Sequence, residues 1–243
     1  MVTKISSFHK GLELIAELIF PQACCVCMKP NTLFCDECKT LIRRTDAATA
    51  CTNCGAAFGY LTCTECKKES WEFDMLMSCA SYEHPLDLLV KSYKDKGEQG
   101  LSKEIAQLMH EAYLSHAAFR PELINIEAMC YIPATPKAYR LRGFDHMRKI
   151  AQDFSDLSKL ELINCFYKES RLDQRSLGRE ERKENAAQSL HIKDARTAAS
   201  LDNKQLLLID DVLTTGATLR EGAALLKEAG AKAVFGLVLA RVW

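Results

Sequence analysis

Apolar residues after about position 70 alternate between short continuous runs and longer segments with helical spacing. The continuous runs predict strands over residues 73–82, 128–133, 162–167, 206–209 and 233–242. The periodic segments predict helices over residues 84–93, 101–118, 144–160 and about 219–229. Continuous apolar strands separated by helices indicate an α/β fold whose parallel sheet is covered by helices on both faces.

Two segments do not follow this alternation. Residues 1–20 have amphipathic helical spacing, with Glu13 and Glu17 inside the apolar run, which predicts a short N-terminal helix rather than a signal peptide. Residues 171–185 are highly charged and weakly periodic, which predicts a loop long enough to act as a lid. We therefore expect an N-terminal helix over residues 1–20, a cysteine-rich module over residues 21–70 and an α/β domain over residues 71–243.

Charge and hydropathy narrow the setting in which the chain works. The 243 residues include 32 Lys and Arg and 32 Asp and Glu, so the formal net charge is zero. Bulk charge therefore predicts no polyanion partner, and any basic surface must be local. No apolar stretch approaches the roughly 18–20 residues of a membrane span. Without an export signal we expect the cytoplasm, including the inner face of the membrane, where conditions are reducing.

Eight of the twelve cysteines form four CxxC pairs within residues 24–66. The pairs are Cys24/Cys27, Cys35/Cys38, Cys51/Cys54 and Cys63/Cys66. Seven residues separate the first two pairs and eight separate the last two, so the segment is an internal repeat. Two CxxC pairs bring four thiolates to one tetrahedral Zn²⁺, which predicts a double zinc ribbon with about two structural zinc ions.

Disulfides and redox chemistry are the alternatives for these cysteines. Disulfides are not expected in a reducing compartment, and redox CxxC motifs do not occur as four evenly spaced pairs. Zinc would also supply folding energy that so short a module cannot obtain from a core, on the order of 10–16 kcal/mol per site. At the first pair, spacing favours Cys24 and Cys27, with Cys25 as the alternative to Cys24.

Most of the polar chemistry of the α/β domain is concentrated after the strand at residues 206–209. Asp210 and Asp211 follow it directly. The next helix is preceded by small and hydroxyl residues: Thr214, Thr215, Gly216, Ala217 and Thr218. A helix N-terminus attracts anions, and carboxylates suit sugar hydroxyls or hydrated Mg²⁺. The pattern predicts a ribose 5-phosphate site, since a plain strand–turn–helix with a Thr cap would not explain two adjacent carboxylates.

A basic segment follows the strand at residues 128–133. Lys137, Arg140 and Arg142 would reach the same sheet edge as the two aspartates, because ligands of parallel sheets bind at the carboxyl ends of strands. Arginine clamps suit pyrophosphate oxygens. The alternative is a solvated basic loop without a ligand.

Residues 209–218 resemble the phosphoribosyl-pyrophosphate (PRPP) signature of type I phosphoribosyltransferases. The resemblance implies a type I phosphoribosyltransferase-like fold, with Asp210 and Asp211 on the ribose hydroxyls and residues 214–218 around the 5′-phosphate of PRPP bound with Mg²⁺. With the cysteine pairs, essentially residues 18–243 resemble the ComF family. Its further motifs are matched by Ile132, Pro133 and Pro136, by Arg142, Gly143 and Phe144, and by Arg171, Gln174, Leu177, Arg182 and Asn185.

Asp145 and His146 depart from the family pattern, which has Asn-Gln there. The departure argues against a ligand role for this pair and predicts that His146 lies at a helix start. The ComF resemblance implies a role in natural competence, with incoming single-stranded DNA and DNA-uptake proteins as partners on the cytoplasmic side. The alternative is an active phosphoribosyltransferase on an unidentified acceptor. No general base stands out, and Glu180, Glu181 and His191 are candidates only by exclusion.

Overall fold

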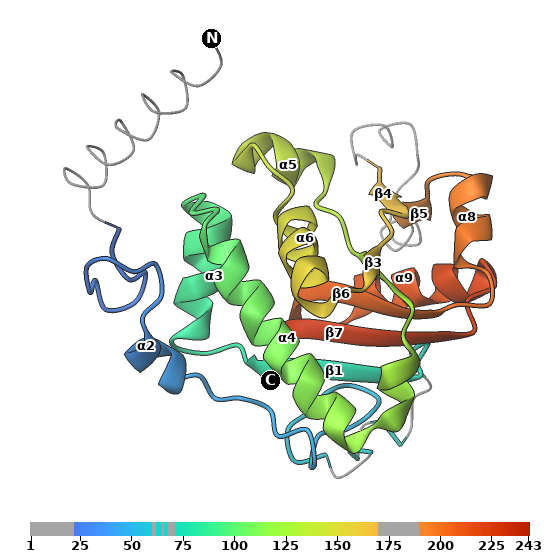
Figure 1. The fold of residues 1–243 in the computed structure, drawn as a ribbon, viewed down its shortest axis with the longest axis horizontal. Helices are drawn as coiled ribbons and strands as arrows, with labels where there is room; N and C mark the ends of the chain where they lie inside the picture. The colour runs from blue at the N-terminus through green and yellow to red at the C-terminus, as the bar shows by residue number, and fades with distance from the viewer. Residues whose placement is uncertain (1–21, 60–61, 65, 68–70, 170–189) are drawn as a thin grey trace, which may run out of the picture.

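The structure is a computed structural model that describes residues 22–59, 62–64, 66–67, 71–169 and 190–243. Within them, five parallel strands form a sheet of order β1-β7-β6-β2-β3 (Figure 1). The strands are β1 (Met75–Ser81), β2 (Ala128–Tyr131), β3 (Glu161–Leu162), β6 (Gln205–Leu213) and β7 (Ala233–Arg241). The parallel sheet predicted from the apolar runs is confirmed.

Helices cover both faces of this sheet, as predicted. One face is covered by α3 (Leu86–Asp95), α4 (Leu101–Phe119) and α6 (His146–Ser158). The other carries α8 (Ala195–Leu201) and α9 (Ala217–Glu228). Successive side chains of a strand point to opposite faces. Met77 and Leu237 therefore enter the first core, whereas Leu76 and Leu208 enter the second.

The basic segment is a helix, α5 (Pro136–Arg142), which was not among the predicted helices. Thr135 caps its start by accepting the Ala138 N–H at 3.2 Å, and Pro136 occupies the first turn. Gly143 ends it in the left-handed conformation, with φ at 78°. A seven-residue helix is too short for its periodicity to appear in the sequence.

The strand predicted over residues 162–167 is two strands in different sheets. Residues 161–162 form β3 beside β2, whereas β4 (Phe166–Lys168) pairs antiparallel with β5 (Leu190–Ile192). A tight turn, in which the Cys165 N–H donates to the Ile163 carbonyl at 3.0 Å, separates them. β5 and α8 were not expected from the pattern.

Strand β6 is longer than predicted. Its pairing with β2 stops at Ile209, where the apolar run ends, but its pairing with β7 continues to Leu213. On the side that pairs with β7, Asp210 and Asp211 therefore lie inside strand β6. On the side that pairs with β2, they lie beyond Ile209, the last residue with a partner in β2. The expectation that they follow the strand was wrong, and they lie at the carboxyl edge of the sheet because β2 is short.

The cysteine-rich module packs against the sheet and the first helical layer. Its short helix α2 (Asp36–Thr40) lies near α3 and α4, and Cys24, Cys35 and Cys38 belong to the same core as those helices (Figure 1). The second half lies on β1, where the Leu76 N–H donates to the Thr52 carbonyl at 2.6 Å. The predicted N-terminal helix and charged lid lie outside the described residues, and the boundaries at residues 20 and 70 stay predictions.

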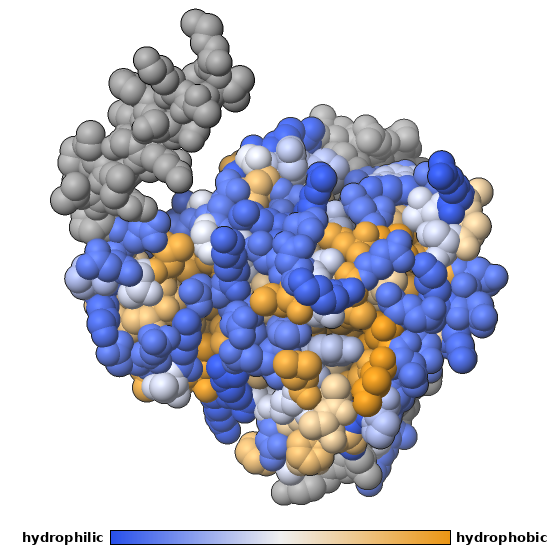
Figure 2. Space-filling view, in the orientation of Figure 1, coloured by the Kyte–Doolittle hydropathy of each residue, from blue (hydrophilic) through white to orange (hydrophobic). Residues whose placement is uncertain are grey.

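Exposed apolar side chains gather where α4 leads into η1 (Pro121–Asn125). Leu114, Phe119 and Ile124 are 53, 52 and 72% exposed, and Figure 2 shows apolar surface over this part of the face. η1 leads into the start of β2, so this surface lies at the amino edge of the sheet, away from the polar segments.

In the part of the chain that the structure describes, no helix is long and apolar enough to cross a membrane.

Candidate functional site

Asp211 is the centre of a charged network at the carboxyl edge of the sheet. Its buried carboxylate accepts Lys94 Nζ from α3 at 2.5 Å and His146 Nε2 from the start of α6 at 2.6 Å. Burial alone would raise the pKa of Asp211, but the His146 hydrogen bond and the Lys94 charge outweigh it and hold this pKa below its usual range. Asp211 is therefore a fixed anion.

The ring of His146 joins Asp211 to the basic helix. Arg142 Nη1 lies 3.1 Å from His146 Nδ1, on the side of the ring opposite Asp211. A guanidinium can only donate, so Nδ1 accepts and the ring proton belongs to Nε2, which donates to Asp211. His146 begins α6 as predicted. The argument against a ligand role for His146 stays a prediction, but the ring lies at the site through its contacts with Asp211 and Arg142.

Asp210 differs from its neighbour in its ionisation. Its Oδ1 accepts the Asp211 N–H at 2.9 Å, and the side chain is only partly covered. Burial, together with the charge of Asp211, raises the pKa of Asp210 to about 7, although the charge of Lys168 on β4 acts in the opposite direction. The site thus pairs a permanent carboxylate with one that gains its charge near neutral pH.

The predicted phosphate loop connects β6 to α9. Gly216 caps the helix in the left-handed conformation, with φ at 77°, which a residue with a side chain would rarely adopt. Thr214, Thr215 and Ala217 are exposed around it, at the N-terminus of a 12-residue helix. The free N–H groups and dipole of such a terminus attract anions.

Positive charge lies on both sides of α5. Between the end of α3 and α5, Lys94, Lys96 and Arg142 line an open basin of about 490 Å³. On the other side is a second depression of about 360 Å³, which we call the basic groove. Its cations are Arg140, Arg148, Lys168 and Lys193, and its exposed aromatic side chains are Tyr139 and Tyr167. Among the described residues, these four cations have no ion-pair partner.

The three basic residues predicted to bind pyrophosphate therefore lie in three different surroundings. Arg142 reaches Asp211 through His146, and Arg140 lines the basic groove. Lys137 is exposed on the first turn of α5 and has no contact with Asp210 or Asp211 in the described part of the chain.

The eight paired cysteines form two groups of four. One group is Cys24, Cys27, Cys35 and Cys38, and the other is Cys51, Cys54, Cys63 and Cys66. Within each group the sulfur atoms all lie within 4.8 Å of one another, and three sulfur pairs are 3.8, 3.5 and 3.7 Å apart. Four sulfurs at Zn–S bonds of about 2.3 Å would be about 3.8 Å apart, so both groups fit a tetrahedral zinc ion.

All twelve cysteines lie in the described residues and none forms a disulfide, which does not support the disulfide alternative. Cys25 lies outside both groups, and burial with the neighbouring charges of Cys24 and Glu98 raises its pKa to about 12. Geometry thus favours Cys24 over Cys25 as the ligand.

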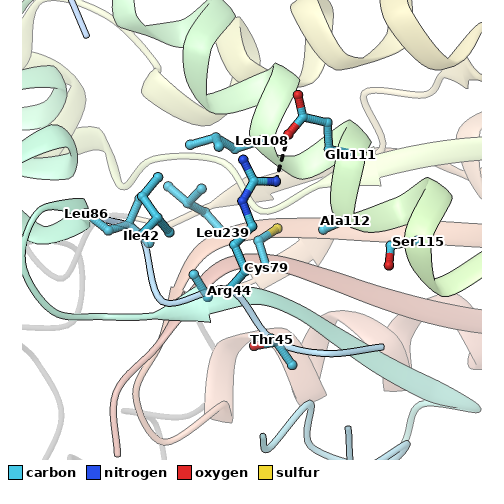
Figure 3. Close-up of a pocket in the computed structure, with 11 residues that line it drawn as sticks. Ile42, Arg44, Thr45, Cys79, Leu86, Leu108, Glu111, Ala112, Ser115 and Leu239 are labelled. Carbon is cyan, nitrogen blue, oxygen red and sulfur yellow. Dashed lines mark hydrogen bonds and ion pairs between the residues drawn. The ribbon is translucent and has the colours of Figure 1, made fainter. Parts of the chain in front are cut away.

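A separate cavity of about 80 Å³ lies between residues 42–45, β1 and the helices α3 and α4 (Figure 3). Arg44 reaches across it to Glu111 at 2.7 Å, and Leu86, Leu108 and Leu239 make much of its wall. Ligand pockets usually enclose about 300–1,000 Å³, so this cavity is too small for a sugar phosphate.

Comparisons with known proteins agree with this architecture. A family model described as phosphoribosyl transferase domain matches residues 142–241. Competence protein F of Haemophilus influenzae is 25% identical over 195 residues, covering 79% of this chain and 84% of that protein. Competence protein ComFC of Streptococcus pneumoniae is 28% identical over 221 residues, covering 82% and 91%. DNA utilization protein YhgH of Escherichia coli K12 is 25% identical, covering 89% and 96%.

Among solved structures, a glutamine PRPP amidotransferase from B. subtilis has a TM-score of 0.37 and 14% identity, and this chain spans 25% of its length.

The sheet, its helical layers and the family match define a protein with a phosphoribosyltransferase-like domain, preceded by two four-cysteine groups. More narrowly, the chain is a homologue of the proteins named competence protein F and ComFC, which confirms the resemblance to the ComF family.

Proposed function

We propose that this chain binds PRPP with Mg²⁺ at the carboxyl edge of its sheet. The observation that carries the proposal is the pair of unlike carboxylates, Asp210 and Asp211, between a phosphate-type loop and the basin lined by Lys94 and Arg142. The carboxylates of Asp210 and Asp211 would accept hydrogen bonds from the ribose hydroxyls, and the loop at residues 214–218 would bind the 5′-phosphate. The pyrophosphate would lie toward Lys94, Lys96 and Arg142.

This arrangement suits the departure of pyrophosphate from the ribose. Positive groups near the basin would stabilise the charge that develops on the leaving group, and Mg²⁺ bound with PRPP would neutralise part of it. The protein residues would mainly hold the donor in place.

His146 is expected to matter for PRPP affinity through its two hydrogen bonds. His146→Leu removes the donor to Asp211 and the acceptor for Arg142, and should weaken Mg²⁺-PRPP binding by about 10-fold or more. His146→Gln can still donate through its amide and accept through its carbonyl, so its affinity should stay within about threefold of wild type. Calorimetric titration measures both. Equal affinities for the Leu and Gln variants would contradict a role for the hydrogen bonds.

We further propose a role in natural competence, in which the chain handles incoming single-stranded DNA on the cytoplasmic side together with DNA-uptake proteins. The names of the homologues support the process, and the basic groove supports the ligand. Tyr139 and Tyr167 are 52 and 40% exposed beside cations that form no ion pair with any residue the structure describes, although Asp145 also lines the groove. Aromatic faces that stack bases, flanked by Lys and Arg that meet phosphates, are typical of single-strand binding.

Arg140→Ala/Arg148→Ala is expected to weaken binding of a single-stranded oligonucleotide and to flatten its salt dependence. Losing two phosphate contacts should reduce the slope of log K against log salt by roughly 1.4. Fluorescence anisotropy over a salt series measures this. Lys103→Ala/Lys232→Ala removes the same charge from exposed positions outside the groove and should leave the slope unchanged. An unchanged slope in the arginine variant would move the DNA site elsewhere.

The second candidate is an active phosphoribosyltransferase on an unidentified acceptor. The complete PRPP-type motif favours it, since a purely structural domain would not need two carboxylates beside a phosphate loop. Pyrophosphate release from PRPP, measured with and without candidate acceptors and single-stranded DNA, separates the two. Turnover that requires an acceptor supports the enzyme, whereas tight binding without turnover supports PRPP as a bound signal.

A further inference from the structure

Trp71 connects the second cysteine group to the core beneath the phosphate loop. Its partly buried indole packs against the cluster of Cys51, Cys54 and Cys66. The same side chain packs against the core between the sheet and α9. Among the residues that the structure describes, it is the only one that belongs to both clusters.

The indole also contacts the phosphate loop itself. A Cβ atom placed on Gly216 would lie 3.1 Å from Trp71 Cζ3 and 3.5 Å from Cη2. The far edge of the ring therefore lies against the one residue of the loop that is in the left-handed conformation. Because Gly216 sets the direction in which α9 begins, the indole limits how the loop can move.

The first turn of α9 is attached to the same segment by charge. The Arg220 guanidinium lies 5.0 Å from the centroid of the Trp71 ring, and Glu72 binds it through two hydrogen bonds of 2.7 and 3.3 Å. Trp71 and Glu72 are neighbours in the chain, so one dipeptide contacts both the cap and the first turn of the helix. Cation–π and bidentate contacts add directional restraint to apolar packing.

We propose that the second cysteine group, through Trp71, holds the phosphate loop in its anion-binding shape. Trp71 lies five positions after Cys66, so the metal-bound thiolates would restrict where the indole can lie. The first group has a different setting: its Cys24, Cys35 and Cys38 pack into the core of α3 and α4. Zinc bound at the second cysteine group should therefore affect the phosphate loop differently from zinc bound at the first. The inference rests on the proposed function only in treating the loop as a phosphate site.

Hydrogen–deuterium exchange of the amides in residues 214–220 tests the coupling without any ligand. Cys63→Ser and Cys27→Ser each remove the least buried thiol of one group and should each lose about one zinc ion. Exchange should accelerate about 10-fold or more in Cys63→Ser and stay unchanged in Cys27→Ser. Trp71→Ala should reproduce the Cys63→Ser result with its zinc content intact, whereas Trp71→Phe keeps an aromatic contact and should change exchange less.

Affinity for ribose 5-phosphate supplies the second measurement. It should fall about 10-fold in Cys63→Ser and in Trp71→Ala, with little further loss in the double variant, because both act through one contact. Unchanged exchange in Trp71→Ala, or equal exchange in the two cysteine variants, would overturn the inference. If the wild-type protein binds no ribose 5-phosphate, the proposed function fails. Hydrogen–deuterium exchange still shows whether the second cysteine group and the loop are coupled. If Cys63→Ser does not fold, the comparison of Trp71→Ala with Trp71→Phe decides it.

Discussion

Chelation of zinc is expected to unfold the cysteine-rich module and to lower the thermal midpoint of the whole chain. Each structural zinc contributes on the order of 10–16 kcal/mol, which equals or exceeds the total stability of about 5–15 kcal/mol typical of a domain. The effect should extend beyond the module, because Cys24, Cys35 and Cys38 lie in the same core as α3 and α4. Metal analysis of protein purified under reducing conditions should give about two zinc ions per chain.

Cys25→Ser is the matched control for the zinc prediction. Cys25 is adjacent to Cys24 but outside both groups, so this variant should keep about two zinc ions and a nearly unchanged melting curve. Cys24→Ser should lose one ion and melt lower. Protein that contains no zinc and forms disulfides between the paired cysteines under reducing purification would contradict the double zinc ribbon.

The sheet was predictable because burial on both faces leaves a continuous apolar run in each long strand. β1, β6 and β7 each contain such a run, and the helices between them have clear spacing. Elements that depend on caps or partners were not predictable. α5 is defined by Thr135, Pro136 and Gly143 rather than by an apolar stripe, and β4 exists through its pairing with β5.

The candidate site was predictable where its chemistry is contiguous in sequence. The aspartates and the loop occupy nine consecutive positions, and the cysteine pairs have their own spacing signal. The partners of Asp211 have no such signal. His146 lies 65 positions away from it, and Lys94 is one of several lysines at the end of α3. Only the tertiary fold shows that these two residues, rather than their neighbours, meet the carboxylate.

Asp210→Asn/Asp211→Asn is expected to abolish Mg²⁺-dependent PRPP binding in calorimetric titrations. Each carboxylate contributes hydrogen bonds of about 1.5–3 kcal/mol to the ribose hydroxyls, so the double variant should bind at least about 100-fold more weakly. Asp36→Asn/Asp156→Asn removes two exposed carboxylates from outside the site and should bind normally. Unchanged affinity in the Asp210/Asp211 variant would rule out the ribose assignment.

The single variants should affect stability in opposite directions, which tests the electrostatics of the pair separately from the ligand. The folded-state pKa of Asp210, about 7, lies above its ordinary 3.8, so ionised Asp210 lowers stability as pH rises from about 4 to about 7. Asp210→Asn removes that loss and should melt higher than wild type at pH 8. The pKa of Asp211 is lowered, so its contribution is present at neutral pH and lost only in acid. Asp211→Asn leaves Lys94 without its buried partner and should cost on the order of 3 kcal/mol. Thermal midpoints at pH 5 and pH 8 measure both stability changes. If the midpoints of the two variants shift in the same direction at pH 8, the assignment of one fixed and one titrating carboxylate is contradicted.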